Sequence, residues 1–264
     1  MKYLITFGIC TYNRKDILLR SAKSLKSIDR YHEINVRIYD DCSTEYDKRF
    51  LQALFPEAKT IHVQKKNCGA DKNTSIMYED FLRSGDDLLF NADSDILYSK
   101  DIIHIIESML DKTDGFFSVF NTPAHAVTGS AGSSMLAKKI VGAAGCCLTR
   151  ETAGIILKNV TSRDKSFDTK MCEVLNAKGK RILTTKKSYV QHIGVVGQNT
   201  DFFSFDYGVG FDWDSVENAR SIEDAFEKYI LSIQKFKNTK IGKVYGILIT
   251  LYRRIRKLEK CIKK

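Results

Sequence analysis

The first hundred residues alternate continuous apolar runs with segments in which apolar residues recur at helical spacing. Such runs are typical of strands buried on both faces of a parallel sheet. The apolar runs cover residues 3–10, 36–39, 61–63 and 88–90, and the helical segments cover residues 17–25, 50–54, 76–82 and 102–110. The alternation predicts an α/β fold with a doubly wound, mostly parallel sheet flanked by helices.

The pattern changes after residue 115. Shorter strands are predicted at residues 116–120, 146–149, 182–184 and 189–193, and a helix at residues 168–177. Residues 122–137 are rich in Gly, Ser and Ala, which predicts a mobile loop. Residues 195–213 mix three glycines with six aromatic side chains, and two interpretations stay open. This segment closes over a ligand as a lid, or it packs its aromatic side chains onto the core.

The carboxyl-terminal residues carry both a helical apolar stripe and the net charge of the chain. Seven apolar residues spaced three and four apart predict one amphipathic helix: Ile241, Val244, Leu248, Leu251, Ile255, Leu258 and Ile262. Residues 235–264 hold eleven of the 42 Lys and Arg and one of the 32 Asp and Glu, which leaves 31 of each elsewhere. This distribution argues against nucleic-acid binding and favours peripheral membrane contact through residues 239–264. Homodimer formation or a partner enzyme are the alternatives.

These patterns predict a domain organisation and a cellular setting. We expect one domain over residues 1–205, with a nucleotide-binding half at about 1–98 and an acceptor half at about 99–205. An aromatic loop and helical extension would follow over 206–238, and the basic tail helix over 239–264. The seven cysteines contain no CxxC pair, which favours reduced thiols. We therefore expect a cytoplasmic protein at the inner face of the membrane.

Polar clusters follow the first four predicted strands. The carboxyl ends of parallel strands meet at one sheet edge, where ligands bind. The clusters are Thr11-Tyr12-Asn13-Arg14, Asp40-Asp41, Asn67-Cys68-Gly69 with Lys72-Asn73, and Asp93-Ser94-Asp95. Two carboxylates two residues apart can converge on one hard cation, which would bridge diphosphate oxygens. A surface turn is the alternative for Asp93 and Asp95.

These four motifs, in this order, resemble glycosyltransferase family 2 with the GT-A fold, over about residues 3–200. The resemblance implies an inverting transfer from a nucleotide diphosphate sugar, commonly linked to UDP, and a divalent cofactor, Mn²⁺ or Mg²⁺. It also implies a glycan or lipid-linked acceptor and a place in cell-surface polysaccharide or glycan synthesis. The implied nucleotide-sugar-binding residues are Thr11, Tyr12, Asn13, Arg14, Asp41, Asn67, Lys72 and Asp93.

The resemblance also assigns roles to individual residues. Thr11 and Tyr12 would line the base pocket and Asp41 would accept a hydrogen bond from the base. Asp95 would bind the metal, Asp93 would face the ribose or the metal, and Lys72 would sit near the nucleotide.

Two later residues complete the expected site. His192 stands where family members often place a third metal ligand or a phosphate contact. Asp168 would be the catalytic base, since one carboxylate suffices to take the acceptor proton; its alternative is a helix N-cap. The family often has Glu before this Asp, whereas Phe167 stands here. A catalytically inactive GT-A domain within a glycan synthase complex is therefore the alternative function.

Overall fold

The structure is a computed structural model that describes residues 2–161, 167–194 and 206–216, and in the carboxyl-terminal part residues 236, 239–245, 247 and 248. The chain divides into two compact units, Met1–Val216 and Glu217–Lys264. The first unit therefore extends beyond residue 205, the boundary expected from the sequence. Among the described residues, no helix combines the length and the apolar character needed to cross a bilayer.

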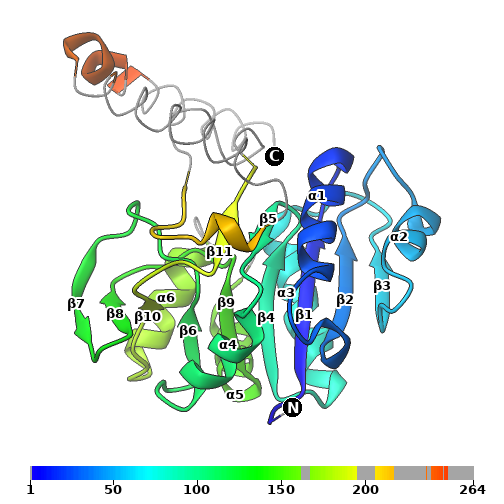
Figure 1. Ribbon diagram of the computed structural model, residues 1–264, viewed down its shortest axis with the longest axis horizontal. Coiled ribbons are helices and arrows are strands. Elements are labelled where there is room, and N and C mark those ends of the chain that lie inside the picture. Colours follow the sequence, from blue (N-terminus) through cyan, green and yellow to red (C-terminus); the bar gives the residue numbers. More distant parts are fainter. Residues whose placement is uncertain are drawn as a thin grey trace. The chain divides into compact units, whose positions relative to one another are not determined.

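A nine-stranded sheet forms the centre of the first unit (Figure 1). Its strands lie in the order β3 (Thr60–Val63), β2 (Asn35–Asp40), β1 (Ile5–Thr11), β4 (Leu88–Asp93), β9 (Cys146–Thr149), β6 (Phe116–Ser118), β10 (Leu183–Thr185), β8 (Met135–Lys138) and β7 (Val127–Ala131). The first four run parallel, β9 is antiparallel to both neighbours, and β10 is parallel to β6. The α/β fold predicted from the sequence is confirmed.

Helices cover both faces of this sheet. One apolar cluster joins it to α1 (Lys15–Lys26), α2 (Lys48–Leu54) and α4 (Ile102–Leu110). A second cluster joins the other face to α3 (Ala70–Ser84), α5 (Arg150–Asn159) and α6 (Phe167–Ala177). A two-stranded sheet of β5 (Ile96–Tyr98) and β11 (Val190–His192) and two short 3-10 turns, Tyr31–Glu33 and Trp213–Ser215, complete the elements. The result is a three-layer α/β/α arrangement.

The two faces of β1 show why its residues alternate in size. Ile5, Phe7 and Ile9 are buried against the first cluster. On the other face α3 lies so close that a Cβ on Gly8 would stand 2.3 Å from Sδ of Met77. Glycine at this position therefore allows α3 to pack against β1, which places the first turn of α3 beside the carboxyl end of the strand.

The predicted mobile loop over residues 122–137 is wrong. This segment contains β7 and β8, which pair as an antiparallel hairpin. Four of the five residues of β7 are exposed, so no alternating apolar pattern marks it as a strand. The hairpin is fixed by the pairing of β8 with β10, which lies about fifty residues later in the chain. The sequence analysis also missed β5 and α5.

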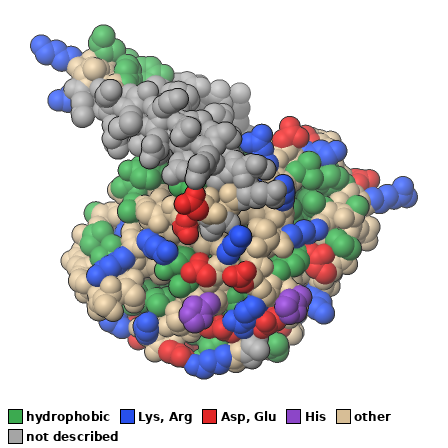
Figure 2. Space-filling view, in the orientation of Figure 1, with side chains coloured by type: hydrophobic (Ala, Val, Ile, Leu, Met, Phe, Trp, Pro, Cys, Tyr) green, Lys and Arg blue, Asp and Glu red, His purple; other side chains and the backbone are tan. Residues whose placement is uncertain are grey.

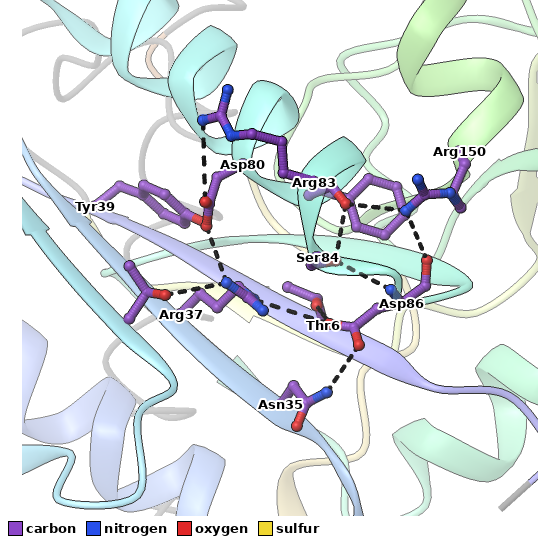
Figure 3. Close-up of polar contacts among 11 residues, drawn as sticks. Thr6, Asn35, Arg37, Tyr39, Asp80, Arg83, Ser84, Asp86 and Arg150 are labelled. Atoms are coloured by element: carbon purple, nitrogen blue, oxygen red, sulfur yellow. Dashed lines mark hydrogen bonds and ion pairs between the residues drawn. The ribbon is translucent and has the colours of Figure 1, made fainter.

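A polar cluster links β1, β2, α3 and α5 at the amino-terminal edge of the sheet (Figure 3). Buried Asp86 accepts hydrogen bonds from Thr6 Oγ1 and from Asn35 Nδ2, the latter at 3.0 Å. Asp80 Oδ2 accepts from Tyr39 Oη at 2.6 Å and from Arg37 NH1 at 3.1 Å. Arg37 Nε has no hydrogen-bond partner among the described residues and lies 3.8 Å from Asp86 Oδ2, while the other groups named here are paired with one another. The cluster is therefore structural.

The described surface agrees with the neutral charge expected for the body of the chain. On the face shown in Figure 2, acidic and basic side chains of the first unit are interspersed, without an extended patch of one sign among the residues described. In the second unit, described residues 240–245 are helical, and Ile241, Val244 and Leu248 are exposed. The remainder of the predicted tail helix lies outside the described residues.

Candidate active site

A cavity of about 660 Å³ opens at the carboxyl ends of β1 and β4, as predicted from the parallel strands. The residues that line it come from the strand ends, the first turn of α3, the first turn of α6 and β11. They include Thr11, Tyr12, Asn13, Arg14, Asp41, Asp93, Asp95, Asp168 and His192. The structure thus gathers nine of the eleven predicted site residues around one hollow. Asn67 and Lys72 are not among those that line it.

The turn after β1 holds two consecutive residues in a left-handed conformation. Asn13 has φ 51° and Arg14 has φ 56°, a backbone state that non-glycine residues adopt at a cost. The Asn13 side chain stabilises this turn, because its Oδ1 accepts from the backbone N–H groups of Thr44 at 2.7 Å and Glu45 at 3.2 Å. The turn starts α1 at Lys15 and places the Arg14 guanidinium beside Asp95.

Asp41 anchors the loop that leads into α3. Its two carboxylate oxygens accept from the backbone N–H groups of Cys68 at 2.7 Å and Gly69 at 2.8 Å. Asn67 Nδ2 donates to the Asp41 backbone carbonyl at 3.3 Å, while exposed Lys72 lies on α3 away from the cavity lining. Asp41 therefore fixes the position of the first turn of α3 as well as lining the cavity.

Asp95 pairs with both a guanidinium and an imidazole. Its Oδ2 lies 2.8 Å from Arg14 NH2 and 3.1 Å from His192 Nε2. Burial raises the pKa of Asp95, but the charges and hydrogen bonds of His192 and Arg14 outweigh burial and lower it. Burial and the neighbouring Asp95 charge raise the pKa of Asp93 to about 7. Two acidic groups so close together thus leave negative charge that a cation would offset.

Gly194 allows this arrangement by having no side chain. A Cβ at this position would lie 2.0 Å from Asp95 Oδ2 and 2.7 Å from Arg14 NH1. The backbone N–H of Ile193 donates to the Asp95 carbonyl at 2.7 Å, and His192 pairs with Ile96 across β11 and β5. The small sheet therefore holds His192 and Gly194 directly against the Asp95 carboxylate.

Asp168 lies on the opposite side of the cavity, in the first turn of α6. The helix begins at Phe167, and the hydrogen bond that the Asp168 side chain accepts comes from the Ala143 backbone N–H at 3.2 Å. Burial, followed by the nearby Asp71 and Asp206 carboxylates, raises the pKa of Asp168 to about 6. A carboxylate with this pKa is matched to accepting a proton near neutral pH.

Three further polar residues line the same side, and the sequence analysis missed them. His125 follows β6, Asp71 lies in the first turn of α3, and Asp206 lies next to Thr122, whose Oγ1 donates to Asp206 Oδ1 at 3.4 Å. His125 comes just after a predicted strand, so the rule that found the other clusters would have found it. Asp206 carried no such signal, because tertiary contacts place it.

The structure describes only the second part of the aromatic segment at residues 195–213. Residues 195–205 lie outside the described residues. The backbone of Val209 is bound to Asn121 and Ser188, and the Phe211 side chain is buried with its ring 5.2 Å from that of Trp213. For Phe211 the packing interpretation is therefore confirmed.

The donor chemistry of Asp93, Asp95 and His192 fits a divalent cation. Carboxylate oxygens are the ligands that Mn²⁺ and Mg²⁺ prefer, and an imidazole is acceptable to Mn²⁺. The pKa of Asp93 is raised first by burial and then by the charge of Asp95, and a cation between the two carboxylates would offset that second contribution. Within the described part of the chain, no three potential ligands stand close enough to form a completed metal site. A cation would therefore complete its coordination with oxygens from a ligand.

Residues 6–128 match the model of glycosyl transferase family 2. This segment includes every predicted nucleotide-sugar-binding residue together with Asp95. The match shows that this segment is similar to glycosyl transferase family 2. The family segment ends before Asp168 and His192, which the fold alone brings to the same cavity.

Solved structures with the same fold cover more of the chain. The Staphylococcus aureus TarS fragment 1–349 is 14% identical, with a TM-score of 0.53 over 73% of this chain and 61% of that chain. The mannosyltransferase PcManGT from Pyrobaculum calidifontis, solved with GDP-Man and Mn²⁺, is 16% identical, with a TM-score of 0.52 over 69% of this chain and 54% of that chain. GalNAc-T7, solved with UDP, GalNAc and Mn²⁺, is 9% identical, with a TM-score of 0.61 over 76% of this chain and 45% of that chain.

These likenesses show a GT-A type fold around the family 2 segment. The chain spans only about three fifths of the TarS fragment and less of the other two. No curated protein matches the sequence.

Proposed function

We propose that this chain is an inverting glycosyltransferase that moves a sugar from a nucleotide diphosphate sugar to an acceptor hydroxyl. One observation carries the proposal: the family 2 motifs and Asp168 meet at one cavity. The nucleotide would lie at the ends of β1 and β2, between Thr11, Tyr12 and Asp41. The TarS fragment has also been solved with UDP-GlcNAc and PcManGT with GDP-Man, and we propose a UDP-linked donor here.

Asp93 and Asp95 would hold Mn²⁺ or Mg²⁺. His192, whose Nε2 lies 3.1 Å from Asp95 Oδ2, would become the third protein ligand once its side chain shifts toward the cation, because the described residues do not form a completed three-ligand site. The cation, when bound, neutralises the diphosphate and stabilises the charge on the leaving nucleotide. This chain's own residues then orient the donor. Arg14 already contacts Asp95, and Gly194 leaves the space for that contact. The donor's sugar would point from this wall of the cavity toward Asp168.

Asp168 would act as the general base. Its carboxylate would take the proton of the acceptor hydroxyl while the hydroxyl oxygen attacks the anomeric carbon. The bond to the nucleotide diphosphate would break on the opposite side, which inverts the anomeric configuration. The N–H of Ala143 stabilises the ionised carboxylate and fixes its orientation, because it donates to Oδ1. No covalent intermediate is needed.

We further propose that the second unit brings the enzyme to the inner face of a membrane with a lipid-linked acceptor for polysaccharide or glycan synthesis. The support is the excess of ten positive charges over residues 235–264 and the exposed apolar residues Ile241, Val244 and Leu248. Basic residues around an apolar stripe bind anionic lipid surfaces. Self-association or docking on a partner enzyme would use the same stripe.

The first test is donor binding. Calorimetry with UDP, GDP and their sugars, with and without Mn²⁺, should give binding that Mn²⁺ strengthens at least tenfold. Asp95→Ala should remove the Mn²⁺ effect, whereas Asp16→Asn, at an exposed position of α1, should keep it. Absence of binding by every nucleotide would refute the proposal. Binding without turnover of any donor would instead support a catalytically inactive partner in a synthase complex.

A further inference from the structure

The cavity has a second end, whose lining residues other than Asp168 have no role predicted from the sequence. This acceptor end consists of His125, Asp71, Asp168 and Asp206, all of which line the cavity. A Cβ on Gly142 would stand 3.9 Å from Asp168 Oδ2 and 4.0 Å from His125 Cε1, so both side chains flank the Gly142 backbone. The residues come from four separate parts of the chain and converge on one space.

We propose that His125 and Asp206 bind the acceptor and that the acceptor end selects a sugar or polyol unit without negative charge. The inference rests on the proposed transferase function and adds the class of acceptor. A neutral unit would offer hydroxyl groups to the imidazole and to the carboxylates, which accept hydrogen bonds from hydroxyls. A phosphate or carboxylate on the reacting unit would meet like charge.

The charge balance of the acceptor end supports this selection. Three of its lining residues are carboxylates, and none of the described lining residues there is Lys or Arg. Burial lowers the pKa of His125, which keeps its imidazole neutral near pH 7. The first turns of α3 and α6 each face a carboxylate of their own, Asp71 and Asp168, which offsets the positive ends of these helices.

Among the described residues, the buried cation beside the acceptor end is already engaged. Lys138 is buried, and its Nζ donates to the Thr122 carbonyl at 2.6 Å. Thr122 Oγ1 in turn donates to Asp206. Lys138 therefore supports the Thr122–Asp206 pair from behind the cavity wall and does not offer its charge to a ligand. The opposite wall differs, since Arg14 and a cation on Asp93 and Asp95 suit the anionic donor.

The test uses matched acceptor probes that differ in one charge. Methyl hexosides of gluco, galacto and manno configuration are compared with the corresponding methyl hexuronosides, by ligand-observed NMR on the full chain with UDP and Mn²⁺. At least one neutral glycoside should bind at least tenfold more tightly than its uronoside. Asp206→Asn should reduce that ratio at least threefold, because Asn keeps the acceptor atom for Thr122 and removes the charge.

Two further variants separate this selection from general damage. His125→Ala should weaken the neutral glycoside several-fold and leave UDP affinity unchanged. Asp16→Asn removes a charge at an exposed position of α1 and should leave the ratio as in the wild type.

Failure of the inference can be told from failure of the proposed function. If UDP binds while a uronoside binds as well as its neutral partner, or while no glycoside binds, the acceptor inference is overturned and the transferase proposal stands. If no nucleotide binds in the preceding calorimetry, the transferase proposal is refuted and the acceptor inference with it. An unchanged ratio in Asp206→Asn would also overturn the assignment of this residue.

Discussion

Gly194→Ala is the substitution whose consequence follows most directly from the geometry of the site. The added Cβ would lie 2.0 Å from Asp95 Oδ2, whereas carbon and oxygen need about 3.3 Å. The carboxylate must therefore move by about 1 Å or more. That movement disturbs the contacts of Oδ2 with Arg14 and His192, which are 2.8 Å and 3.1 Å long.

The expected losses can be estimated separately for stability and activity. A hydrogen bond to a charged group contributes about 1.5–3 kcal/mol, and Arg14 is a third exposed, so we expect about 1–2 kcal/mol of destabilisation. Misplacing a reacting group by about 1 Å costs roughly 10²-fold in rate. Urea unfolding and Mn²⁺-dependent donor turnover measure the two effects.

Gly154→Ala is a matched control that should change the free energy of unfolding in the opposite direction. Nothing lies within 4 Å of its added Cβ, and the residue is inside α5, where alanine is favoured by about 0.5–1 kcal/mol. This variant should be slightly more stable and fully active. Wild-type turnover and Mn²⁺ affinity in Gly194→Ala would refute the functional importance of the close packing of residue 194 against the Asp95 carboxylate.

Three other outcomes follow from the same structure. The kcat/KM for donor should rise with pH through about 6, because Asp168 must be ionised to accept a proton. Asp71→Asn should move this rise to lower pH, because the Asp71 charge raises the pKa of Asp168; an unchanged pH profile would contradict that link between the two carboxylates. Asp86→Ala should cost about 2–3 kcal/mol in urea unfolding, since Thr6 and Asn35 lose their buried acceptor, with kcat of the folded enzyme unchanged. Removing residues 239–264 should abolish sedimentation with anionic liposomes; equal sedimentation of both chains would remove the membrane proposal.

The predictable part of the fold is the part whose local pattern and tertiary environment agree. Strands β1, β2 and β4 are continuous apolar runs because both of their faces are covered by helices. The sequence did not predict the hairpin of β7 and β8, because its local pattern and its tertiary environment disagree: exposed β7 has small and polar residues typical of a loop. Its strand character comes from pairing with a distant part of the sheet.

The candidate site divides in a similar way. Residues that directly follow parallel strands, such as Thr11 and Asp93, could be placed at one edge because topology brings strand ends together. Lys72 could not be excluded from the cavity by sequence, because a shift of one position along α3 decides between solvent and the wall, where its neighbours Asp71 and Asn73 lie. Asp206 depends on contacts with Thr122, more than eighty residues away, and no local pattern reports them.

The most direct test of the account is release of nucleoside diphosphate from a panel of UDP- and GDP-sugars with Mn²⁺, in three forms of the full chain. The wild type should turn over at least one donor, and Asp168→Asn should lower that rate at least 10²-fold without changing donor affinity. Glu173→Gln, the same kind of change at an exposed position of α6, should match the wild type. Equal rates in wild type and Asp168→Asn would contradict the central claim.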